Sequence, residues 1–107
     1  MEISSAELQE KLNKGDKMVI DFWAEWCGPC RMQKPIFEQV SQTAIENKSE
    51  VSYYTFNVES DKIFAASLGI RSIPTIKSFS KGSEVTTKVG LMDESQLKTL
   101  ENILING

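Results

Sequence analysis

The pattern of apolar and polar positions predicts helices and strands that alternate along the whole chain. Continuous apolar runs are typical of buried strands, whereas apolar residues every three or four positions are typical of amphipathic helices. Strand patterns occur at 18–24, 51–58, 75–80 and 84–90. Helical patterns occur at 4–15, 28–47, 60–68 and 93–105. In the two long helices we expect a core-facing stripe made of Met32, Ile36, Phe37, Val40 and Ala44, and of Leu97, Leu100 and Leu104.

This order of elements predicts one α/β domain over residues 1–107, with a mixed sheet and helices on both of its faces. The last two strands are joined through residues 81–83, a sequence typical of a hairpin turn. Ser4 with Glu7 predicts a capping box at the start of the first helix, and Gly15 predicts its end.

Composition excludes several functions. The chain is 40% hydrophobic and 25% charged, as is usual for a globular protein, and its net charge of −3 offers no basic surface for nucleic acid or anionic lipid. No apolar run approaches the roughly 20 residues that span a bilayer, and the start of the chain does not resemble a secretory signal. We therefore expect a cytoplasmic protein, in which thiols are kept reduced and disulfides tend to be transient or catalytic.

The candidate chemistry lies in the stretch DFWAEWCGPC, residues 21–30, which holds the only two cysteines; the chain has no histidine. Cys27 falls between a predicted strand and a predicted helix, at the edge where open α/β sheets bind ligands. The partial positive charge of a helix N-terminus would stabilise a thiolate there and lower the pKa of Cys27. We expect Cys27 to be exposed and activated, and Cys30, one turn further on, to be the resolving thiol.

The residues between the cysteines suit the start of a helix. Pro29 loses no intrahelical hydrogen bond at that position. Gly28 is expected to keep the turn tight and to leave Cys27 uncovered.

A close pair of cysteines can also serve as a structural disulfide or as part of a metal site. A structural disulfide that closes so short a loop would gain little entropy. A tetrahedral zinc site needs four ligands, and without histidine the chain offers two thiolates and carboxylates. We expect no metal site, and metal carriage through two thiolates stays open as an alternative.

DFWAEWCGPC, followed by IRSIPT (70–75), SKG (80–82) and VG (89–90), is similar to the thioredoxin family over essentially the whole chain. The resemblance implies the thioredoxin fold, an α/β fold whose mixed sheet has four or possibly five strands. It implies a general protein-disulfide reductase that acts by dithiol–disulfide exchange through Cys27 and Cys30, as a cytoplasmic monomer.

The same resemblance implies what the protein works with. No bound cofactor is needed, because the two sulfurs carry the electrons. The implied partners are disulfide-containing client proteins and a thioredoxin reductase, through which electrons come ultimately from NADPH.

The resemblance also gives Asp21 a role, because it matches the family's buried aspartate, which relays a proton to and from the second cysteine. Val19 and Trp23 share its strand face, so we expect a desolvated carboxyl group with a raised pKa. Trp23 is expected to pack in the core. Trp26, directly before Cys27, is expected on the surface, where it offers apolar area to a partner.

The client groove is also assigned by resemblance. Pro74 matches a proline that the family keeps cis, facing the disulfide. Ile73 precedes it, and its backbone would pair with the client chain. Gly90 matches a glycine that lines the same groove, where a side chain would obstruct the docked peptide.

Two departures from the family pattern stand out. Thr55 occupies the position where many thioredoxins carry a lysine near the aspartate, so Asp21 lacks its usual cationic neighbour. Few residues precede the first helix, so the family's leading strand is expected to be vestigial or missing. An oxidase or isomerase of the same fold and a non-redox binding module remain alternatives. The Gly-Pro pair argues against the first, because it adds no group that stabilises the thiolate.

Overall fold

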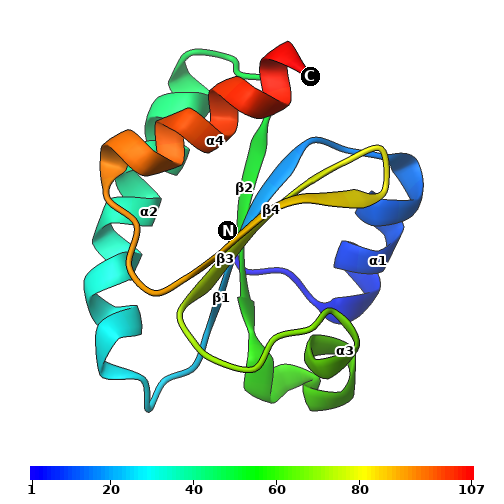
Figure 1. The fold of residues 1–107 in the computed structure, drawn as a ribbon, viewed down its shortest axis with the longest axis vertical. Coiled ribbons are helices and arrows are strands. Elements are labelled where there is room, and N and C mark those ends of the chain that lie inside the picture. The colour runs from blue at the N-terminus through cyan, green and yellow to red at the C-terminus, as the bar shows by residue number, and fades with distance from the viewer.

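A four-stranded sheet crosses the middle of the molecule in the order β2–β1–β3–β4 (Figure 1). The computed structural model describes residues 1–107. β1 runs parallel to β2 and antiparallel to β3, which pairs antiparallel with β4. The strands are β1 Met18–Trp23, β2 Ser52–Asn57, β3 Thr75–Ser80 and β4 Ser83–Val89. The predicted mixed sheet of four strands is therefore confirmed.

Helices cover both faces of this sheet, with α2 and α4 on one side and α1 and α3 on the other (Figure 1). Their bounds are α1 Ser5–Lys14, α2 Gly28–Glu46, α3 Lys62–Ser67 and α4 Glu94–Asn106, and a 3-10 turn, Val58–Ser60, precedes α3. The predicted element order is confirmed, and each predicted end lies within two residues of the observed one. None of the helices has the length and apolar character that crossing a membrane requires.

Local sequence signals explain where the elements stop. The Ser4 side chain accepts from the Glu7 backbone N–H and the Glu7 side chain accepts from the Ser4 N–H, which completes the predicted capping box. Gly15 ends α1 in the left-handed conformation, with φ of 77°. Lys81 and Gly82 both take positive φ between β3 and β4, as tight hairpin turns require.

Alternation along β1 divides the apolar core between the two faces of the sheet. Val19 points to the α2 and α4 face, where it packs with Phe37 and Leu100. Ile20 and Phe22 point to the α1 and α3 face. Asp21 follows Val19 by two residues, so the strand places its carboxyl group on the α2 face.

The predicted stripe of α2 was wrong at one position. Met32 is 62% exposed, whereas the neighbouring Gln33 is fully buried. The Gln33 side chain donates to the Met92 carbonyl at 3.0 Å and accepts from the Met92 N–H at 2.8 Å. A buried amide with both functions satisfied costs little, so Gln33 occupies the core position and ties α2 to the segment before α4.

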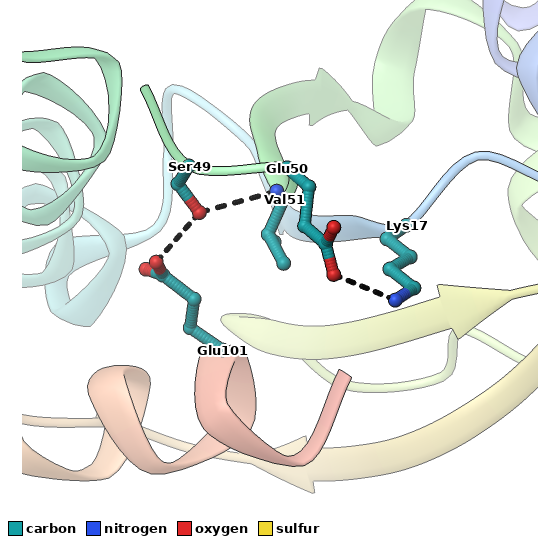
Figure 2. A network of polar contacts seen from close by, with 5 residues as sticks. All are labelled: Lys17, Ser49, Glu50, Val51 and Glu101. Atoms are coloured by element: carbon teal, nitrogen blue, oxygen red, sulfur yellow. Dashed lines mark hydrogen bonds and ion pairs between the residues drawn. The ribbon is translucent and has the colours of Figure 1, made fainter. Parts of the chain in front are cut away.

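A network of polar contacts lies at the end of the molecule where α2 ends (Figure 2). The Ser49 hydroxyl donates to Glu101 of α4 at 2.7 Å and accepts from the Val51 N–H at 3.2 Å. Lys17, before β1, pairs with Glu50 at 2.8 Å. These contacts fasten the start of β2 to α4 and to the start of β1.

Candidate active site

The two cysteines lie where β1 gives way to α2. Cys27 is the N-cap of α2, and its sulfur accepts a hydrogen bond from the Cys30 N–H at 3.2 Å. Cys27 and Cys30 form a disulfide, with their Cα atoms 5.3 Å apart. Gly28 begins the helix and Pro29 stands in its first turn, as predicted for a helix start. The structure is therefore that of the oxidised protein.

The surroundings of the disulfide differ from the expectation in one respect. Cys27 is only 4% exposed, as is Cys30, so the prediction of an uncovered Cys27 is wrong for this oxidised form. The reason is that its sulfur turns back over the first turn of α2 toward Cys30. Trp26 is 69% exposed, as expected, and its indole N–H donates to Glu59 at 2.7 Å.

The structure brings part of the expected client groove together. The Ile73–Pro74 bond is cis, as the resemblance implied. The Gly90 N–H donates to the Pro74 carbonyl at 2.9 Å, which joins two positions far apart in sequence. Gly90 has φ of +97°, and a Cβ built on it meets no heavy atom within 4 Å. Trp26 and Ile73 line a shared surface pocket of about 340 Å³.

Asp21 is held in the middle of the sheet, on the face that α2 covers. Its neighbours across the sheet are Thr55 of β2 and Ile76 of β3. The residue is 2% exposed, and its Oδ1 atom has no hydrogen-bond partner. An ionised carboxylate in such a place loses its hydration without a compensating donor.

Burial, and after it the nearby carboxylate of Glu2, together raise the pKa of Asp21 from its ordinary 3.8 to about 7. The predicted direction is therefore confirmed. A carboxyl group with a pKa close to neutral pH can both take up and release a proton under ordinary conditions.

Asp21 and Cys30 line the same open cleft, which has a volume of about 800 Å³. Cys27 does not line it. Trp23 lies at this cleft half-buried, and its indole N–H donates to Glu2 at 2.9 Å. The expectation that Trp23 simply packs in the core was wrong, because this polar contact holds its ring at the edge of the site.

The N-terminal segment contributes a residue that the sequence reasoning missed. Glu2 forms a single parallel bridge with Thr55, so the family's leading strand is reduced to one bridge, as expected. The Glu2 side chain also accepts from the Thr55 hydroxyl at 2.6 Å. Nothing in the local sequence marks Glu2, because its partners come from β1 and β2. The structure brings no three Cys, Asp or Glu side chains together as a metal site.

A mixed sheet flanked by helices, with a Cys-Gly-Pro-Cys disulfide at a helix N-terminus, defines a protein of the thiol–disulfide exchange class. The thioredoxin family model matches residues 1–102. Thioredoxin from Malassezia sympodialis is 42% identical over 97 residues, which is 90% of each chain, and thioredoxin from Pyropia yezoensis is 37% identical over 98 residues, 92% of this chain and 89% of its own. The solved thioredoxin of Plasmodium falciparum has a TM-score of 0.82 at 30% identity, covering 96% of this chain and 98% of its own.

The chain belongs to the thioredoxin family. It is a protein-disulfide oxidoreductase that works by dithiol–disulfide exchange through Cys27 and Cys30. Its substrates are accordingly proteins that contain disulfides.

Proposed function

We propose a division of labour in which Cys27 attacks the client disulfide, Cys30 resolves the complex, and Asp21 carries the proton of Cys30. The observation that supports it most is the unequal placement of the sulfurs. Cys27 is the N-cap of α2 and its sulfur accepts a hydrogen bond from the Cys30 N–H, which favours a thiolate. Cys30, by contrast, lines the cleft of Asp21.

The reaction then runs in two exchange steps. The Cys27 thiolate attacks one client sulfur, a Cys27–client disulfide forms, and the other client sulfur leaves and takes up a proton. Cys30 gives its proton to the Asp21 carboxylate, directly or through one water molecule, and its sulfur attacks that of Cys27. The client's second thiol leaves with a proton, so two electrons and two protons have moved to the client and Cys27–Cys30 is oxidised.

The client segment would dock on Trp26, Ile73, Pro74 and Gly90. Trp26 is exposed and shares a pocket with Ile73, which provides apolar area at the disulfide. The space above Gly90 is open, so a backbone can approach there closely. Gly28 and Pro29 serve to start α2 directly after Cys27.

The oxidised protein would be recycled by a thioredoxin reductase, with electrons ultimately from NADPH and no cofactor bound to this chain. The family membership supports this partner. We further propose that residues 1–107 act as a single domain and a cytoplasmic monomer, without nucleic-acid or membrane partners. The net charge of −3 supports the last point.

The division of labour is tested by trapping. Reduced Cys30→Ser protein is incubated with a client that contains a disulfide, and covalent complexes are counted on non-reducing gels. We expect stable mixed disulfides through Cys27, and none from Cys27→Ser or from the double variant. Faster alkylation of Cys30 than of Cys27 in the reduced wild type at mildly acidic pH would reverse the assigned roles.

A further inference from the structure

We propose that Glu2 is a positioning residue for disulfide exchange, a fixed negative charge that holds the proton on Asp21. The proposal rests on the role of Asp21 given above. It assigns a function in the reaction to a residue outside the Cys-Gly-Pro-Cys motif and outside the client groove.

The Glu2 carboxylate is fixed by three hydrogen bonds from two strands. One oxygen accepts from the Trp23 indole N–H at 2.9 Å and from the Thr55 hydroxyl at 2.6 Å. The other accepts from the Asn57 backbone N–H at 2.7 Å. A side chain with this many partners keeps its charge in one place, although the residue itself is exposed.

These contacts place the charge next to Asp21. Glu2 bridges to Thr55, and Thr55 is in register with Asp21 across β2 and β1. Trp23, the second donor to Glu2, lies two residues along β1 on the same face as Asp21. The Thr55 hydroxyl donates to Glu2, while Asp21 keeps an oxygen without a partner. The local arrangement therefore supplies Asp21 with a negative neighbour and no donor for that oxygen.

Other charges line the cleft, and they come from the N-terminal segment, from the loop after β1 and from α2. The charged groups that line it, besides Asp21 and Glu2, are the Met1 amino group, Glu25 after β1, and Arg31, Lys34 and Glu38 of α2. The Arg31 guanidinium donates a hydrogen bond to the backbone carbonyl of Glu25 at 3.2 Å. After burial, the charge that raises the pKa of Asp21 is that of Glu2, and none of the cations lowers it. A like charge disfavours ionisation, which is the direction expected here.

The test is a titration of the Asp21 carboxyl group by NMR in the oxidised protein. Glu2→Gln keeps the size of the side chain and removes the charge. We expect the midpoint of Asp21 to fall by several tenths of a pH unit in this variant, since Glu2 is partly screened by water. Glu38→Gln removes another carboxylate from the rim of the same cleft and is expected to leave the midpoint where it is. An equal midpoint in the wild type and Glu2→Gln would overturn the proposal.

Salt gives a second measurement that needs no variant. In the wild type, added salt should lower the Asp21 midpoint by screening Glu2, and this dependence should be weaker in Glu2→Gln. Equal salt dependence would count against a role for the Glu2 charge.

The rate of the Cys30 step against pH completes the test, because a merely structural contact would not move it. We expect its profile to shift with the midpoint in Glu2→Gln. A moved midpoint with an unmoved profile would overturn the role of Asp21, and that of Glu2 with it. If Glu2→Gln left the Asp21 midpoint unchanged while Asp21→Asn still slowed the Cys30 step, the Glu2 proposal alone would be overturned.

Discussion

Asp21 is a carboxyl group that the sheet keeps away from water, on a strand whose other residues are all apolar. Such a group is normally a cost to the fold. Here the same burial brings the pKa of Asp21 close to neutral pH. A group that accepts a proton and later returns it works best with such a pKa. The absence of histidine from the chain makes this adjustment of a carboxyl group more important.

The cost of Asp21 predicts a pH-dependent stability. Because the pKa of Asp21 is higher in the folded chain (about 7) than its ordinary value of 3.8, the folded protein binds more protons between these values, and its stability falls as pH rises through that window. Asp21→Asn has no carboxyl group at this position, so its free energy of unfolding does not fall in this way. We expect the free energy of unfolding of the variant, relative to the oxidised wild type, to increase by on the order of 4 kcal/mol between pH 4 and pH 8. Paired urea melts across this range measure the difference, and a difference that does not change with pH would show that Asp21 is solvated.

At the scale of elements, α2 organises the site because the disulfide lies at its start and its buried amide reaches the segment of Gly90. Its first residue follows Cys27, its first turn holds Cys30, and its next buried position is Gln33. Through Met92, Gln33 fastens α2 to the segment that also carries Gly90. The disulfide and one wall of the proposed client groove are thus tied to a single helix.

We expect Gln33→Leu to lower the free energy of unfolding by about 1–3 kcal/mol for each Met92 group left without a partner. Weaker docking should follow, seen as a higher KM for a disulfide peptide with a smaller change in kcat. Gln39→Leu is the matched control, because this residue is exposed on the same helix. Unfolding free energies that match for the two variants would mean that the Met92 contacts contribute nothing.

The elements were predictable from sequence where apolar spacing and caps determine them. The buried strand around Asp21, the capping box at Ser4 and the turn at Gly82 all follow from local patterns. Gln33 was not predictable, since a polar side chain is normally expected in solvent and its partner lies 59 residues away. Glu2 was not predictable because its partners lie 21 to 55 residues away. Burial of a satisfied amide and a carboxylate held between strands depend on the completed tertiary structure.

At the scale of the whole molecule, the disulfide lies at one end of α2, and the polar contacts that join α4 to the start of β2 lie at the other. The helix has 19 residues, about 28 Å of length, with Cys27 before its first residue and the Ser49–Glu101 contact just after its last (Figures 1 and 2). The sheet between them presents Asp21 to the exchange end. In the proposed mechanism, this separation lets the exposed Trp26 meet clients while distant contacts fasten α4 to the start of β2.

The central claim, that Asp21 serves Cys30 in the second exchange step, is tested most directly by stopped-flow kinetics. Reduced protein is mixed with excess of a fluorescent disulfide peptide, and release of the second peptide thiol is followed from pH 5 to pH 9. For the wild type we predict a release rate that rises with a midpoint near pH 7. In Asp21→Asn we predict a rate lower by on the order of tenfold or more at neutral pH, without that midpoint, while mixed-disulfide formation by Cys27 is little changed. The same release rate and the same pH profile in both proteins would contradict the account.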